Sequence, residues 1–330
     1  MGFSLGNVFK SAVTAVVIAA AVYYLGPASI SAGQTFATFA GAAAITAGAA
    51  SAVSQLLAET PKDFDLGAQL RGQLVSSRQA AGDAMIVYGK SRVGGTIVHM
   101  ETTGEKNETM YMAIAMAGHE IDSVQNVYVA DEKFALTPSG SIYTINYKGS
   151  TSAINFDYAT GTANQSAMEL FAGTAASAFQ FKGIATLGVK LVFDADKFPQ
   201  GLPNVTAEIQ GKKVYDPRDA TTAYSTNAAL CIRDYLTDVD YGFAATDAEI
   251  DDDSFIAAAD ICDEDVTLAE GGTEKRYTIN GAFSSGEKPK EILAKMLTAC
   301  GGSLAYIGGK WTLKVAEYRS PTVTLDDDDL

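Results

Sequence analysis

The N-terminal part of this chain contains no charged residue between Lys10 and Glu59, and alanine and glycine dominate it. Ala12–Leu25 reads as one apolar helix. Gly26-Pro27 would end that helix, because proline cannot continue a helix and disfavours helical backbone in the residue before it. A second apolar stretch runs from Thr35 to Leu57. Residues 1–60 are therefore predicted to form an apolar helical segment.

Small residues recur four positions apart in the second stretch: Ala40, Ala44, Gly48 and Ala52. This spacing lines small side chains along one helix face and permits close contact between helices. Three interpretations of the segment remain open. Lys10, the short apolar run and the small residues near Ser29–Ala32 are typical of a secretory signal. The second run has about the 20 residues that a bilayer requires, so a membrane hairpin is possible and residues 11–58 could contact a host membrane. A helical segment buried in an oligomeric channel fits best, because alanine and glycine are only weakly hydrophobic.

Length and composition exclude some classes of function. A chain of 330 residues can form two ordinary domains and an appendage. Its net charge of -15 argues against binding a nucleic-acid backbone, which requires clustered lysine and arginine. The three cysteines, Cys231, Cys262 and Cys300, form no CxxC pair. Each lies on the apolar stripe of a candidate helix, so buried and inert thiols are expected.

Short strands are predicted after Pro61. Met85–Tyr88 begins the pattern, Val93-Gly-Gly-Thr96 resembles a tight turn between two strands, and Tyr111–Met116 is an apolar run typical of a strand buried on both faces. Residues 148–182 are rich in Ser, Thr, Ala, Gly and Asn, and they are interpreted as a long loop. Residues 61–182 thus form the expected β-rich domain.

A second domain is expected over residues 183–316. Its predicted strands are Gly183–Phe193, Val205–Val214 and Lys275–Phe283, and its last element is a hairpin in which Leu304–Ile307 and Lys310–Val315 flank Gly308-Gly309. Three amphipathic helices are predicted to begin near Ser225 or Thr226, at Asp251–Asp253 and at Pro289. The fold class is therefore α+β, with three helices packed on antiparallel strands in this domain.

Residues that could perform chemistry have simpler explanations. His99 and His119 are the only histidines, and neither has a partner at metal-ligand spacing, so surface or strand-end positions are expected. The acidic run Asp251–Asp253 is expected to cap a helix, and Asp326–Asp329 to be a solvated linker, because neither has calcium-loop spacing. Asp238 and Asp240 could act as paired carboxylates in glycoside hydrolysis, but polar loop positions explain them.

The sequence also lacks the motifs of common enzymes. It contains no Gly-x-Ser-x-Gly elbow, no Walker loop and no Gly-x-Gly-x-x-Gly turn after a strand. We therefore expect no catalytic residue, no cofactor site and no metal site, and we expect that the protein is not an enzyme.

Several blocks in the C-terminal half carry a family resemblance. They are Phe198-Pro-Gln-Gly-Leu-Pro-Asn204, Lys213-Val-Tyr-Asp-Pro-Arg218, Asp234-Tyr-Leu-Thr-Asp-Val-Asp-Tyr-Gly242 and Gly271-Gly-Thr-Glu-Lys-Arg-Tyr277. In this order and spacing they resemble the tail-tip attachment proteins of long, flexible-tailed bacteriophages, the lambda-type host specificity protein J family. The resemblance is clearest over residues 183–330 and extends to residues 82–147.

The resemblance implies a structural protein at the tail tip of a virion, synthesised in the host cytoplasm. It implies a homotrimeric hub with a barrel-like first domain, which closes the distal end of the tail tube and supports host attachment and DNA ejection. Its implied partners are the tube-end and other tail-tip proteins and the tape-measure protein. DNA would pass through the lumen without being bound, and Ala40, Ala44, Gly48 and Ala52 would face the lumen or the tape measure. Family members are much longer, so residues 317–330 would connect to further domains, and a host receptor would be bound by regions outside this chain.

The sequence leaves two other classes of function open. One is a secreted or membrane-anchored β-rich binding protein of a bacterium, with residues 1–32 as its export signal. The other is a carbohydrate-active enzyme that uses a pair of acidic residues.

Overall fold

The computed structural model describes residue 76, residues 82–199 and residues 201–318. The chain divides into two compact units. Among the described residues, unit 1 comprises those up to Met85 together with Arg92–Gln210, and unit 2 comprises Ile86–Ser91 together with the residues from Gly211 onward.

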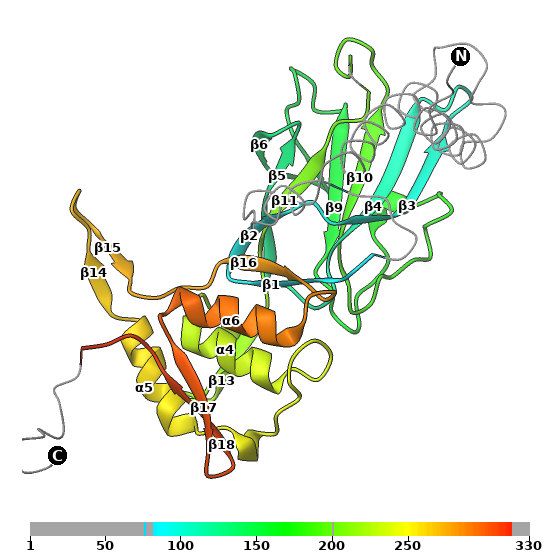
Figure 1. Cartoon of the computed structure of the whole chain (residues 1–330). Coiled ribbons are helices and arrows are strands. Elements are labelled where there is room, and N and C mark those ends of the chain that lie inside the picture. Colours follow the sequence, from blue (N-terminus) through cyan, green and yellow to red (C-terminus); the bar gives the residue numbers. More distant parts are fainter. Residues whose placement is uncertain (1–75, 77–81, 200, 319–330) are drawn as a thin grey trace, which may run out of the picture. The chain divides into compact units, whose positions relative to one another are not determined.

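Unit 1 is built from two antiparallel sheets (Figure 1). The six-stranded sheet has the order β3-β4-β10-β9-β8-β7, and the four-stranded sheet has the order β2-β11-β5-β6. The strands of the larger sheet are β3 (Thr96–Thr103), β4 (Thr109–Ala117), β7 (Thr137–Ser139), β8 (Ile142–Thr144), β9 (Ile154–Ala159) and β10 (Ala185–Val192). Those of the smaller sheet are β2 (Lys90–Val93), β5 (Ser123–Val129), β6 (Glu132–Ala135) and β11 (Val205–Gln210).

The central strands of the larger sheet are buried on both faces, as the apolar run at Tyr111–Met116 predicts. β4 and β10 pair from Ala117↔Ala185 to Thr109↔Val192. The short 3-10 helix η2 (Glu169–Phe171) buries Leu170 and Phe171 beside β9 and β10. Gly188 of β10 leaves the space for this contact, because a Cβ there would lie 3.1 Å from the Leu170 side chain. In the described part of the chain neither sheet closes on itself, so the structure does not show the expected barrel.

Two segments of unit 1 differ from the sequence interpretation. Residues 148–182, expected to form a loop, contain the buried strand β9 and helix η2. Asn155 and Asp157 interrupt the apolar pattern of β9, yet both are buried. Val93-Gly-Gly-Thr96 is not a hairpin turn, because β2 and β3 belong to different sheets. Of the two glycines only Gly95 has a positive φ, whereas the favoured hairpin turn with two central glycines needs positive φ at both.

The three expected α-helices are present in the described part of unit 2. They are α4 (Ala228–Thr237), α5 (Asp252–Cys262) and α6 (Pro289–Ala299). Asn227 caps α4 by accepting hydrogen bonds from the N–H groups of Ala229 and Leu230. Pro289 is the first residue of α6, where its missing N–H costs no hydrogen bond. The 3-10 helix η3 (Asp247–Glu249) precedes α5 and has a capping box between Thr246 and Glu249.

The strands of unit 2 form two-stranded sheets (Figure 1). The pairs are β1 (Met85–Tyr88) with β16 (Gly281–Ser284), β12 (Lys213–Asp216) with β13 (Thr221–Tyr224), β14 (Asp265–Thr267) with β15 (Thr273–Lys275), and β17 (Ser303–Ile307) with β18 (Lys310–Lys314). The final hairpin is confirmed, and both Gly308 and Gly309 have positive φ. The expected strand Lys275–Phe283 is instead split, because only its two ends lie in β15 and β16.

The core of unit 2 joins all three helices to residues far away in sequence. Ile86 and Tyr88 of β1 have no exposed surface and pack with Tyr235, Phe255 and Met296.

The boundary between the two units differs from the expected one. The sequence predicted a division between residues 182 and 183. β10 and β11 pair with β4, β9 and β5 of unit 1, and the division therefore falls after Gln210.

Candidate functional site

The residues expected to face a lumen or a tape measure, Ala40, Ala44, Gly48 and Ala52, lie outside the described part of the chain, as do residues 1–60 and Asp326–Asp329. Among the helices that the structure describes, none has the length and apolar character needed to cross a bilayer. Within the same residues, no group of three or more His, Cys, Asp or Glu side chains is placed to hold a metal ion.

The two histidines occupy different environments. His99 lies within β3 rather than at a surface or strand end, and its side chain is 19% exposed. Its Nε2 atom is 3.5 Å from Glu101 Oε2, and its ring meets Phe171 and Phe179 edge to face. His119 follows β4, and its Nδ1 lies 2.8 Å from the carbonyl oxygen of Glu120. The two histidines are thus separate and share no site.

The expected position of Asp251–Asp253 at a helix start is confirmed, because Asp252 and Asp253 lie in the first turn of α5. Asp251 is the N-cap residue of α5, but its side chain makes no capping hydrogen bond, and it accepts one from the Thr312 hydroxyl instead. Asp252 pairs with the buried Arg233 at 2.8 Å. These carboxylates join α5 to α4 and to the last hairpin, which a local sequence pattern cannot reveal.

One polar cluster of unit 2 surrounds Lys212. Its Nζ lies 2.7 Å from Asp234 Oδ2 and also pairs with Asp238. Tyr88 donates its hydroxyl to the same Asp234 oxygen at 2.6 Å. Burial alone would lower the pKa of Lys212, but the carboxylates of Asp234 and Asp238 outweigh it and raise that pKa. Burial raises the pKa of Tyr88 well above its ordinary value, and Asp234 adds to the effect. Lysine therefore stays charged and tyrosine stays protonated.

Asp238 closes the C-terminal end of α4. Its Oδ1 accepts hydrogen bonds from the N–H groups of Asp240 and Tyr241, each at 2.8 Å. Burial would raise the pKa of Asp238, but the bond from Lys212 and these N–H groups lower it. Asp238 is thus an ionised carboxylate committed to a turn and an ion pair. It and Asp240 are loop residues, as expected.

A second cluster surrounds Arg218. Its guanidinium pairs with Asp216 at 2.7 Å, with Asp263 at 2.9 Å and with Asp260 at 3.1 Å. It thereby ties the β12–β13 turn to the C-terminal end of α5. The bond from Arg218 lowers the pKa of Asp216. Local sequence patterns do not reveal Lys212, Arg218 and Arg233 as organising residues, because their partners lie up to 45 positions away.

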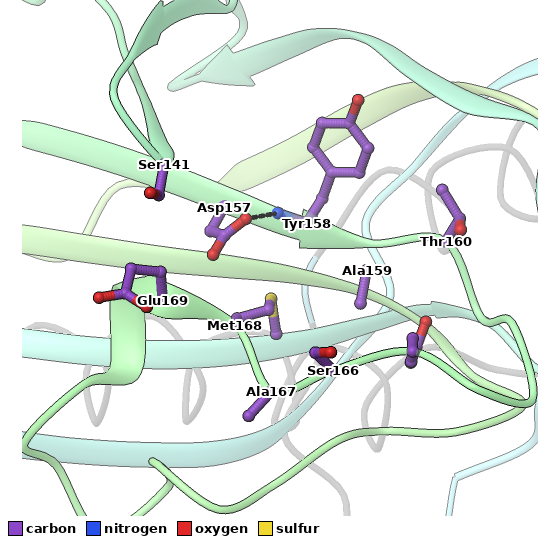
Figure 2. Close-up of a pocket in the computed structure, with 10 residues that line it drawn as sticks. Ser141, Asp157, Tyr158, Ala159, Thr160, Ser166, Ala167, Met168 and Glu169 are labelled. Carbon is purple, nitrogen blue, oxygen red and sulfur yellow. Dashed lines mark hydrogen bonds between the residues drawn. The ribbon is translucent and has the colours of Figure 1, made fainter.

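Unit 1 contains a cavity of about 330 Å³ between β9 and the segment leading to η2 (Figure 2). Asp157 lies at its wall, beside Ser141, Ser166 and Glu169. Its two carboxylate oxygens accept hydrogen bonds from the N–H groups of Tyr158 at 2.8 Å and Leu170 at 3.3 Å. Burial raises the pKa of Asp157, whereas these N–H groups oppose the shift. The carboxylate therefore holds η2 against β9.

The described clusters share one chemical character. Lysine and arginine cations meet carboxylates, and the remaining carboxylate oxygens accept backbone N–H groups. Such an arrangement fixes chain segments relative to one another.

No family model matches the chain. Among solved structures, the chain is similar to one described as "Virion of native gene transfer agent (GTA) particle". The two are 17% identical, the alignment covers 88% of this chain and 68% of that chain, and the TM-score is 0.43. At this TM-score and identity the likeness decides neither fold nor function.

Proposed function

We propose that this protein is a structural virion component: a tail-tip hub that closes the distal end of a tail tube and performs no catalysis. The proposal rests on one observation. The sequence blocks that resemble the lambda-type tail-tip family contain the residues that hold unit 2 together. Lys213–Arg218 supplies Asp216 and Arg218, and Asp234–Gly242 supplies the carboxylates that meet Lys212.

Glycines in these blocks are also required by the local backbone structure. A Cβ on Gly242 would lie 1.9 Å from the carbonyl oxygen of Tyr235, so only glycine fits where the chain returns past the end of α4. Gly271 and Gly272 both have positive φ at the tip of the β14–β15 hairpin. These ion pairs and glycines help to specify the fold of unit 2, and their position inside the resembling blocks supports common descent with that family rather than a common active site.

The partners of this proposed hub follow from the same resemblance. We propose a homotrimer around a central passage, in contact with tube-end and tip proteins and with the tape-measure protein. The two open sheets of unit 1 would then pair with sheets of neighbouring copies. The expected barrel would form only in this assembly. Exposed apolar side chains of unit 1, among them Val98, Phe179 and Ile184, support burial against another subunit.

The test uses particles from cells that express the complete tail gene set. A peptide tag placed at the exposed Gly140, whose Cβ position has no neighbour within 4 Å, is labelled with gold-conjugated antibody. We expect label only at the distal end of the tail, and a chain mass that includes Met1 or Gly2. Tails without label at their distal end would contradict the proposal. A shortened N-terminus in soluble protein that is not part of particles would favour an exported binding protein instead.

A further inference from the structure

The last hairpin of unit 2 has one open edge. β18 is held from its outer side, because Trp311 accepts a hydrogen bond from the N–H of Asp251 at 3.0 Å and Leu313 donates its N–H to the Ser254 hydroxyl at 3.1 Å. Among the strands that the structure describes, β17 pairs with β18 alone. The other side of β17 is therefore the free edge of this two-stranded sheet.

The register shows which groups of β17 face outward. Tyr306 is opposite Trp311, and Leu304 is opposite Leu313. In an antiparallel pair, opposite residues direct their N–H and C=O groups either toward each other or both away. Because Trp311 and Leu313 bond away from β17, Tyr306 and Leu304 must direct theirs away from β18. Among described residues, no backbone hydrogen bond is made by Leu304 or Tyr306 on this outer side.

This edge lacks the features that normally block strand addition. Exposed edges are protected by charged side chains, proline or bulges. In unit 1, edge strand β6 has Glu132 and Lys133, and edge strand β7 has Pro138. β17 reads Ser-Leu-Ala-Tyr-Ile, with no charge and no proline. Its Tyr306 and Ile307 side chains are 53% and 62% exposed.

Charge indicates what the edge would bind. Side chains alternate across the hairpin, so Ser303, Ala305 and Ile307 share the solvent face with Lys310 and Lys314. Neither lysine makes an ion pair with a described residue, although the whole chain has a net charge of -15. Lys314 lies opposite the small Ser303, and Lys310 lies opposite Ile307, so both lysines are on the strand next to the free edge. A strand added beside β17 would meet these two cations.

We propose that the free edge of β17 binds an extended, acidic segment of another protein by β-strand addition. Backbone groups of Leu304 and Tyr306 would supply the hydrogen bonds, and Tyr306 and Ile307 would cover apolar side chains of the partner. Lys310 and Lys314 would select for carboxylates. This inference does not depend on the tail-hub proposal.

The experiment titrates the full chain into two fluorescein-labelled peptides at low salt and follows anisotropy. The acidic probe is Asp-Val-Thr-Val-Thr-Val-Asp, and the basic probe has lysine at both ends. We expect the acidic probe to bind with a Kd of about 100 µM or tighter, and the basic probe at least about 10-fold more weakly. The double variant Lys310→Glu/Lys314→Glu should reverse this preference. The double variant Lys288→Glu/Lys290→Glu, an equal charge change at the exposed start of α6, should leave it intact.

A pair of substitutions at one position tests the backbone contact. Tyr306→Ala removes the ring and should weaken binding of the acidic probe severalfold. Tyr306→Pro removes the outward N–H as well, and it should abolish binding while its far-ultraviolet circular dichroism and melting temperature match those of Tyr306→Ala. Equal binding by the alanine and proline variants would overturn the proposal, as would an unchanged preference in the charge-reversed variant. Absence of acidic-probe binding, with self-association that Tyr306→Pro disrupts, would assign the edge to a second copy and also overturn it.

Discussion

Tyr88 donates its hydroxyl to Asp234 at 2.6 Å, across 146 positions of sequence. This bond places the segment Ile86–Ser91 inside unit 2, although the residues on both sides of the segment belong to unit 1. Lys212 neutralises the same carboxylate at 2.7 Å. The cluster therefore fixes the path of the chain where it enters unit 2.

Removing the cation should cost more than removing the hydroxyl. Lys212→Met leaves two partly buried carboxylates without a counter-charge, and we expect a loss of about 2–3 kcal/mol in the free energy of unfolding. Tyr88→Phe deletes one hydrogen bond to a charged group and should cost about 1–2 kcal/mol. Urea unfolding of both variants, with the exposed Lys290→Met as control, measures these differences. A Lys212→Met protein as stable as the control would contradict the role of the cluster.

Near the same cluster, the backbone at Gly211 lies very close to the backbone at Val87. Replacing the glycine tests this contact. A Cβ on Gly211 would lie 2.1 Å from the carbonyl oxygen of Val87, whereas a Cβ on Gly281 would be 3.6 Å from its nearest neighbour. Gly211→Ala should therefore destabilise the protein by about 3 kcal/mol. Gly281→Ala should change stability by less than about 1 kcal/mol. Thermal unfolding of the two variants compares them directly, and equal melting temperatures would refute the close approach.

The sequence predicted elements whose signals are local. The helices beginning near Asn227, at Asp252 and at Pro289 follow from apolar spacing and from residues typical of helix starts. The last hairpin follows from Gly308-Gly309. These features depend on neighbours within a few positions, which a single sequence displays.

The failures concern contacts between distant residues. Asn155 and Asp157 made β9 look like a loop, because nothing nearby shows that Asp157 accepts the N–H groups of Tyr158 and Leu170. The assignment of β10 and β11 to unit 1 depends on strand pairing over tens of residues. Likewise, the three carboxylate partners of Arg218 become evident only in the folded chain.

The ion pairs of Arg218 predict that the folding stability of the protein depends on pH in the acidic range. Arg218 lowers the pKa of Asp216 below its usual value of 3.8. A carboxyl group with a lowered pKa in the folded state contributes stability above its unfolded pKa and loses it as the pH falls through the folded value. The stability advantage of the native protein over Arg218→Met should thus shrink as the pH falls from about 5 through the lowered pKa of Asp216.

Urea midpoints of both proteins at pH 7, 5, 4 and 3 measure this difference. Lys310→Met, which removes a lysine that pairs with no described residue, is the control, and its midpoint should run parallel to that of the native protein. A constant gap between the native protein and Arg218→Met across this range would contradict the assigned pairing.

The three cysteines should be inert while the protein is folded. All are free and buried, as the sequence analysis expected. Burial raises the pKa of Cys231 and Cys300, and it raises the pKa of Cys262 to about 12. Because the thiolate is the reactive form, we expect no reaction with Ellman's reagent at pH 8 in the native protein. All three thiols should react in guanidinium chloride. Prompt labelling of a native thiol would contradict this burial.

The central claim is that the chain works as one subunit of a ring at the end of a tail. Cryo-electron microscopy of intact particles that carry this chain tests it most directly. We predict three copies around a central channel at the distal end of the tail tube, with units 1 and 2 fitting the density as described. Density for the chain elsewhere in the particle, a ring of another symmetry, or particles that are complete without the chain would contradict the account.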